Sequence, residues 1–225
     1  MFNYEVEPSL LAPLVPHGTE LDAWNGITYL SIVAFRFLRS RVLGIPIPLH
    51  RDFEEVNLRF YVRRQSTTEL RRGVVFIREI VPRRAVASVA RWLYNEPYRA
   101  LPMRSTVATA PHLSVQYGWR LARRWHTVAA RAGQSLTLPA ESSSEQFITE
   151  HYWGYTRQAD GSTIEYHVRH PPWAVAPAAS YEIDADLVAL YGPALASCLT
   201  QPVSVFLAGG SPVTVSRPVS LREKS

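Results

Sequence analysis

Two acidic residues, followed at alternate positions by an amide and a guanidinium, form the first group of side chains that could do chemistry. Glu54 and Glu55 precede Asn57 and Arg59 in an otherwise apolar run. Because side chains alternate across a strand, Glu55, Asn57 and Arg59 share one face, and Glu54 lies on the other. Burial raises the pKa of a carboxyl group and suits it to general acid or base catalysis, whereas an exposed carboxylate would only join an ion-pair ladder. Both interpretations remain open, for either glutamate.

A second group of candidate side chains lies at the end of a later predicted strand. Glu165, His167 and Arg169 alternate on one strand face, and the run ends in His170-Pro-Pro-Trp173. Two successive prolines give a stiff backbone that could hold His170 and Trp173 at the mouth of a pocket, as ligand-binding residues. A rigid turn with an ordinary packed tryptophan is the alternative. No metal site is predicted, because His167 and His170 lie at a strand end and need not converge.

Other signatures of catalysis are missing from the sequence. It contains no Gly-rich phosphate loop, no Cys-x-x-Cys or His-Glu-x-x-His pattern and no Gly-x-Ser-x-Gly, so no cofactor is predicted. Of the 24 lysines and arginines, only Lys224 is a lysine. A guanidinium stays protonated and cannot serve as a Schiff-base nucleophile, which argues against imine chemistry inside the protein.

The composition is that of a globular protein with a sizeable core. With 225 residues, 47% hydrophobic and 19% charged, we expect a single domain spanning residues 1–225. The net charge is +5, but the arginines form scattered pairs rather than a basic face, so no nucleic-acid partner is predicted. The single cysteine, Cys198, cannot form an intrachain disulfide, and no leader or membrane span is recognisable. We therefore expect a cytoplasmic protein without a membrane partner.

The hydrophobic pattern alternates with a period of two in most segments, which indicates an α+β fold built on a large antiparallel, barrel-like sheet. We predict strands at 27–37, 53–63, 73–81 and 112–121, with a hairpin joining the second to the third. Further hairpins are predicted at 152–169, with a type I′ turn at Asp160-Gly161, and at 203–215. Helices are predicted at 83–95, at 142–150 with a capping box at Ser142–Glu145, and at 185–191.

Several short segments, in order along nearly the whole chain, resemble the uncharacterised YqjF-like family. They are Pro13–Asp22, Trp24–Gly26, Ser31–Phe35, Phe53–Val62, Arg72–Phe76, Leu93–Tyr98 and His170–Trp173. That family is related to acetoacetate decarboxylase. The resemblance implies a cone-like antiparallel β-barrel with a few flanking helices and an internal cavity.

The resemblance also implies a change at the reactive position. The decarboxylases carry a Schiff-base lysine and a second lysine in a stretch that is similar to Glu96-Pro97-Tyr98-Arg99. Tyr98 then stands where the reactive lysine would be, and Arg99 where its cationic neighbour would be. A pocket glutamate of the family would fall near Glu54 or Glu55.

Three functions fit these observations. The leading hypothesis is an internal cavity that binds a small keto or enol acid through Arg99 and Arg59. Glu54 or Glu55, with Tyr98, would then transfer protons in an imine-independent lyase, hydratase or isomerase reaction. The first alternative is a non-catalytic metabolite-binding or sensor module. The second is a structural or partner-binding barrel with a filled interior. The sequence leaves the ligand's identity open, and a homo-oligomer is compatible with all three.

Overall fold

The computed structural model describes residues 1–42, 45–46, 52–85, 87–88, 94–133 and 135–221, and strands dominate them. The strands are β1 (Phe2–Val6), β2 (Glu20–Leu21), β3 (Thr28–Phe37), β4 (Arg41–Val42), β5 (Ile45–Pro46), β6 (Phe53–Gln65), β7 (Leu70–Val81), β8 (Tyr98–Ala100), β9 (Met103–Ala108), β10 (Leu113–Leu121), β11 (Arg124–Ala132), β12 (Trp153–Arg157), β13 (Thr163–Arg169), β14 (Val175–Asp184), β15 (Ser204–Ala208), β16 (Thr214–Val215) and β17 (Val219–Leu221). The helices are α1 (Pro8–Leu11), the 3₁₀ turn η1 (Ala12–Leu14), α3 (Ser144–Thr149), α4 (Leu187–Tyr191) and α5 (Pro193–Ala196). No described helix is both long and apolar enough to cross a bilayer.

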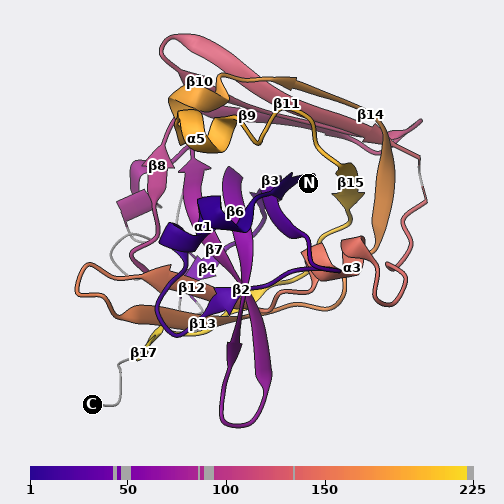
Figure 1. Cartoon of the computed structure of the whole chain (residues 1–225). Coiled ribbons are helices and arrows are strands. Elements are labelled where there is room, and N and C mark those ends of the chain that lie inside the picture. The colour runs from indigo at the N-terminus through magenta and orange to yellow at the C-terminus, as the bar shows by residue number, and fades with distance from the viewer. Residues whose placement is uncertain (43–44, 47–51, 86, 89–93, 134, 222–225) are drawn as a thin grey trace.

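Fifteen strands belong to one sheet, whose main path runs β16-β13-β12-β7-β6-β3-β1-β15-β14-β11-β10-β9. Most neighbours are antiparallel, but β7 pairs in parallel with both β12 and β8. Figure 1 shows β12 and β13 on one side of the central strands β6 and β7, and β9, β10 and β11 on the other. The pairings among the described strands leave the sheet open. They establish a mostly β fold with few helices, and they do not establish a closed barrel.

The two faces of β6 lead to different parts of the interior. Val56, Leu58 and Phe60 point into the main hydrophobic core, together with the fully buried Trp119 of β10. The alternate residues of β6 form the opposite face, which we call the polar face, and Tyr61 on it packs in a smaller cluster with Phe147 of α3. This alternation is the reason that a polar face can lie directly behind an apolar one.

One irregularity changes the phase of the β6–β7 pairing. Leu58 pairs with Arg78, but the next residue, Arg59, pairs with Phe76, so Ile77 is an extra residue on β7. Beyond this bulge, Glu79 pairs with Asn57 and therefore shares the polar face.

Most predicted elements are confirmed. β3, β10 and the β6–β7 and β12–β13 hairpins lie where the alternation predicts them, and α4 ends at Gly192 as predicted. The helix predicted for 83–95 falls partly outside the described residues, since 86 and 89–93 are not among them.

The β12–β13 turn differs from the predicted type I′ turn. Only Gly161 has a positive φ (84°), whereas type I′ needs two such residues, and the closing bond joins Gln158 N to Ser162 O over 2.8 Å. The loop is therefore longer than two residues.

The cap of α3 is displaced by one residue from the prediction. The N-cap is Ser143, whose hydroxyl accepts from the Gln146 backbone N–H, and the Gln146 side chain accepts from Ser142 N at 2.7 Å. A glutamine in place of the predicted glutamate completes the motif.

The predicted C-terminal hairpin at 203–215 is wrong. β15 pairs with β1 and β14, and β16 pairs with β13. Two strands that are neighbours in sequence thus join different parts of the sheet.

Candidate functional site

Glu55 is buried on the polar face of β6, and its side chain is only 2% exposed. Asn57 Nδ2 donates to its Oε1 at 3.0 Å, and the Tyr98 hydroxyl donates to its Oε2 at 3.1 Å. Burial raises the pKa of Glu55 to about 7, although the bonds from Asn57 and Tyr98 and the charge of Arg59 oppose the rise. A carboxyl group with this pKa can both give and take a proton at neutral pH.

Glu79 lies beside this pair because β7 pairs antiparallel with β6 and parallel with β8. It pairs with Asn57 on one side and with Tyr98 on the other. Its Oε2 is buried and has no hydrogen-bond partner. Burial, followed by the charges of Glu96 and Glu55, raises the pKa of Glu79 well above its ordinary value.

A third buried carboxyl group, Glu96, precedes β8. Its Oε1 accepts from Thr156 Oγ1 at 2.5 Å and from the Tyr166 hydroxyl at 2.8 Å. Gly154 makes room for this tyrosine, since a Cβ there would lie 2.1 Å from the Tyr166 ring. Burial raises the pKa of Glu96 to about 8, against the lowering effect of those two hydrogen bonds.

These residues form one group, which we call the acid cluster: Glu55, Glu79, Glu96, Tyr98 and Tyr166. Amide and hydroxyl donors hold Glu55 and Glu96, and none of the three carboxyl groups forms an ion pair with a described lysine or arginine. Buried carboxyl groups without a cation keep their protons to higher pH. The arrangement can therefore store and transfer protons near neutrality.

The structure brings only some of the predicted site residues to the acid cluster. Glu54 lies on the other face of β6 and accepts from Ser105 Oγ at 2.9 Å. Arg99 follows Tyr98 on β8 and pairs with Ile80 of the core, so by alternation it lies on the face away from Glu55. Among the predicted catalytic residues, Glu55 and Tyr98 are in contact.

Arg59 occupies the middle of the polar face. Its Nη2 donates to the Ile148 carbonyl at 3.2 Å, and its buried Nε has no hydrogen-bond partner. Asn57 Oδ1, next to it on the strand face, is also buried without a partner. A donor and an acceptor therefore remain available between Glu55 and the far end of this face.

His170 and Trp173 pack against each other. Their rings stack 4.2 Å apart at 17°, and the Trp173 indole donates to Ser211 Oγ at 2.8 Å. The Tyr152 ring also packs against His170, with the two ring centres 4.9 Å apart. These contacts hold both side chains, but they do not bring them to the acid cluster.

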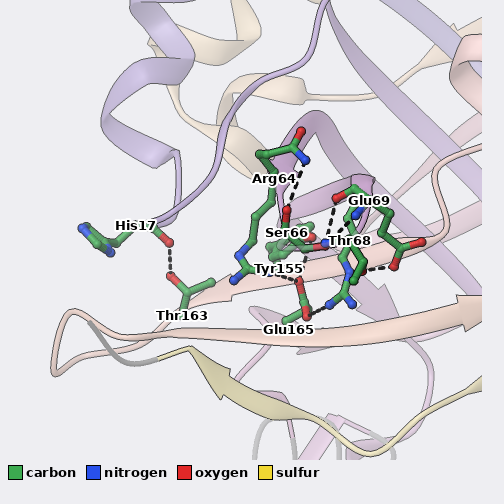
Figure 2. Close-up of polar contacts among 10 residues, drawn as sticks. His17, Arg64, Ser66, Thr68, Glu69, Tyr155, Thr163 and Glu165 are labelled. Carbon is green, nitrogen blue, oxygen red and sulfur yellow. Dashed lines mark hydrogen bonds and ion pairs between the residues drawn. The ribbon is translucent and has the colours of Figure 1, made fainter. Parts of the chain in front are cut away.

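Glu165 is bound very differently, although the next residue on β13 is Tyr166 of the acid cluster. Figure 2 shows Glu165 with Arg64 and Tyr155, whose side chains lie 3.3 Å and 2.9 Å away. Arg71 makes a third contact at 2.5 Å. With two guanidinium groups and a phenol on its oxygens, this carboxylate has the surroundings of a structural ion pair.

The sequence analysis missed a second buried site at the other end of the polar face. Asp22 is 2% exposed and accepts from Arg72 Nε at 2.7 Å and Nη2 at 3.3 Å. His151 Nε2 lies 3.1 Å from the same carboxylate. Burial alone would raise the pKa of Asp22, but the bonds and charges of His151 and Arg72 outweigh it and lower this pKa to about 2.

Glu79 and Glu96 were also missed. Glu79 follows an arginine in a strand, which reads as an ordinary charged pair. Glu96 follows Asn95, and its nearness to Tyr98 in the stretch similar to the decarboxylases is the signal that could have singled it out. Within the described part of the chain, no three His, Cys, Asp or Glu side chains are placed to hold a metal ion together.

Comparison with known families identifies the chain. Residues 1–212 match the model of DUF2071, described as an uncharacterised conserved protein. The chain belongs to this family. The protein YqjF of Bacillus subtilis, also uncharacterised, is 30% identical over 176 residues, which cover 76% of this chain and 69% of YqjF.

Solved structures share the fold. Acetoacetate decarboxylase of Legionella pneumophila matches with a TM-score of 0.64 and 13% identity, covering 99% of this chain and 84% of its own. An acetoacetate decarboxylase-like enzyme of Sphingomonas wittichii matches with a TM-score of 0.59 and 13% identity, and the match covers 98% of this chain and 89% of the enzyme. The enduracididine biosynthesis enzyme MppR, in complex with pyruvate, matches with a TM-score of 0.58 and 12% identity, and the match covers 97% of this chain and 82% of MppR. The chain therefore shares the mostly β fold, with few helices, of these enzymes.

Proposed function

We propose that this protein binds a small keto or enol acid and moves a proton on it, without forming an imine. The contact between the Tyr98 hydroxyl and Glu55 carries this proposal, because it joins a phenol to a carboxyl group whose pKa is about 7. The proposal includes a cone-like barrel around an internal cavity that holds the acid. The complex of MppR with pyruvate, a keto acid, supports the choice of ligand class.

The reaction needs three roles, and described residues are available for each. Ionised Glu55 takes a proton from the carbon next to the keto group, and the electron pair moves onto the keto oxygen. As Glu55 takes up this proton, the Tyr98 hydroxyl releases its hydrogen bond to Glu55 and donates it to the keto oxygen, where negative charge develops. Glu55 exchanges its proton with solvent and returns a proton to the same carbon, so that the product is the substrate with an exchanged hydrogen.

The substrate carboxylate would bind a guanidinium, and Arg59 is the better placed of the two predicted arginines. It shares the polar face with Glu55, and its Nε lacks a partner. Glu79 and Glu96 would hold the protons that Glu55 exchanges, since both also have a raised pKa.

Proton exchange at carbon tests the proposal. Pyruvate, acetoacetate and 2-oxobutyrate would be incubated with the protein in deuterated water and followed by proton NMR. We expect exchange with at least one acid, reduced by roughly 100-fold or more in Glu55→Gln, as for loss of a general base. Tyr98→Phe should lose roughly tenfold or more, since it removes one hydrogen bond to the developing charge.

The chain offers a matched control. Glu54→Gln changes the neighbouring carboxyl group on the opposite strand face and should keep the wild-type rate. Exchange that persists in Glu55→Gln, or that is lost equally in Glu54→Gln, would contradict the assignment. An absence of exchange with every acid would contradict catalysis altogether.

A further inference from the structure

A cleft of about 670 Å³ opens beside α3, and no residue of the acid cluster lines it. Its walls include Trp24, Arg72 at the start of β7, Phe147 and Glu150 of the α3 region, and Trp153 of β12. This volume is within the range of roughly 300–1,000 Å³ typical of small-molecule sites. The cleft is therefore large enough for a ligand of its own.

The cationic group of the cleft is fixed in position. Asp22 binds Arg72 through Nε and Nη2, and the guanidinium carbon lies 4.8 Å from the centre of the Phe147 ring. Nη1 has no hydrogen-bond partner among the described residues, and the Arg72 side chain is 40% exposed. One edge of the guanidinium is thus anchored, and the remaining donors are free to bind a carboxylate from the ligand.

An acidic group, Glu150, also lines the cleft. Glu150, at the C-cap of α3, stands one turn beyond Phe147. Its carboxylate oxygens are 3.4 Å from Gln146 Nε2, and no arginine in the described ranges pairs with them. Its charge adds to burial in raising the pKa of Tyr152, a further residue of the cleft wall. This carboxylate is available to bind an ammonium group.

Aromatic side chains complete the walls, and each is held in place. The Trp24 indole donates to the Ser142 carbonyl at 2.9 Å. Trp153 lies between the guanidinium of Arg71 at 4.1 Å and the ring of His167 at 4.4 Å. Rigid rings of this kind provide contact area for a flat apolar group at low entropic cost.

From this arrangement we infer that the cleft is a binding site for a free α-amino acid with an aromatic side chain. The ligand carboxylate binds Arg72, its ammonium group binds Glu150, and its ring packs against Trp24 and the edge of Trp153, whose two faces are taken by Arg71 and His167. Both charges are needed, because Arg72 alone would accept any carboxylate and Glu150 alone any amine. The site is separate from the acid cluster and from the function proposed for it.

Calorimetric titration with three matched probes tests this inference on the wild-type protein. L-phenylalanine carries both charged groups, 3-phenylpropionate lacks the ammonium group, and 2-phenylethylamine lacks the carboxylate. We expect L-phenylalanine to bind, and each analogue to bind roughly tenfold or more weakly, which corresponds to one lost charge-assisted hydrogen bond. Equal affinity for L-phenylalanine and either analogue would overturn the inference, as would no binding of L-phenylalanine at millimolar concentration.

One pair of variants assigns the acidic group. Glu150→Gln should weaken L-phenylalanine binding to the level of 3-phenylpropionate and leave 3-phenylpropionate unchanged. Glu145→Gln alters another α3 acid that is not part of the cleft wall and should bind as the wild type does. Unchanged L-phenylalanine affinity in Glu150→Gln would overturn the role of Glu150. The comparison of the three probes uses the wild-type protein and does not depend on the folding of any variant.

Discussion

The polar face of β6 and β7 ends in two buried acidic sites that behave in opposite ways. At one end, Asp22 contacts Arg72 and His151, and its pKa falls to about 2. At the other end, Glu55 accepts hydrogen bonds from Asn57 and Tyr98 among the described residues, and burial raises its pKa to about 7. Both side chains are 2% exposed, so burial does not explain the difference. The hydrogen bonds and charges of His151 and Arg72, which Glu55 lacks, decide whether the buried acid is a fixed charge or a proton carrier.

The largest effect is expected from removing the proton carrier. Native Glu55 keeps its proton up to about pH 7, whereas the unfolded chain releases it near 4.5. The native state binds more protons in this window, so the free energy of unfolding falls as the pH rises through it. Glu55→Gln removes this dependence. The unfolding free energy of the variant, relative to that of the wild type, should therefore rise by about 3 kcal/mol between about pH 4.5 and about pH 8. Urea unfolding at a series of pH values measures the difference.

Glu54→Gln is the control for that series, because its side chain lies on the other face of β6. Its unfolding free energy should follow the wild-type curve at every pH. If the Glu55→Gln curve also stays parallel to the wild type, the buried carboxyl group does not carry the proton that the comparison assigns to it.

A smaller effect is expected from removing the cation at the other end. Arg72→Gln leaves Asp22 buried with only His151 as a partner and should lower the free energy of unfolding at pH 7 by about 2 kcal/mol, reduced from the full cost of a buried pair because Arg72 is partly exposed. The wild type should lose the Asp22 contribution as the pH falls from about 4 to about 2, and the variant should lose less.

Arg63→Gln is the matched substitution one strand away. Arg63 pairs with Glu20 at 2.8 Å, but both side chains are exposed (43% and 63%), so the expected change is below about 0.5 kcal/mol. Similar losses in the two variants, measured by urea unfolding at pH 7, would show that burial of Asp22 does not matter.

The smallest effect concerns two tyrosines on paired strands. Tyr166→Phe removes a donor from Glu96, which should cost about 1 kcal/mol and raise the pKa of Glu96 further above about 8. Tyr155→Phe removes a donor from Glu165, which keeps Arg64 and Arg71. Carbon-13 NMR titration of the glutamate carboxyl groups should show an upward shift of the Glu96 pKa in Tyr166→Phe and an unchanged Glu96 pKa in Tyr155→Phe. A shift of Glu96 in both variants would remove the distinction between the two acids.

Local patterns predict much of this arrangement. Alternation alone places Glu55, Asn57 and Arg59 on one face of β6, because a strand has a period of two whatever its partners are. The proximity of Tyr98 to Glu55 depends instead on the parallel pairing of β8 with β7, and only the family resemblance suggested it.

Long-range pairings account for what the sequence did not predict. Asp22 and His151 are 129 positions apart, and the sequence between them carries no signal of their contact. β15 and β16 looked like a hairpin because two short apolar runs flank Gly209-Gly210, yet each pairs with a distant strand. Glu79 reaches the polar face only through the bulge at Ile77, and no local pattern reveals which strand of a pair will carry an extra residue.

Because of that extra residue, the number of residues in β7 determines which side chain reaches the acid cluster. Two regions of β7 contribute to the polar face: alternate residues from Arg72 to Phe76 before Ile77, and Glu79 after it. Because two residues separate Phe76 from Glu79, a regular strand would set them on opposite faces. Deletion of Ile77 would remove the bulge and leave Arg78 opposite Leu58 and Glu79 opposite Asn57, as they are now. A regular pairing of the full-length strand would instead place Arg78 opposite Asn57, with a guanidinium next to Glu55 and the Glu79 carboxyl group on the apolar face. A family member one residue shorter at this point would keep the acid cluster in a regular ladder, without a bulge.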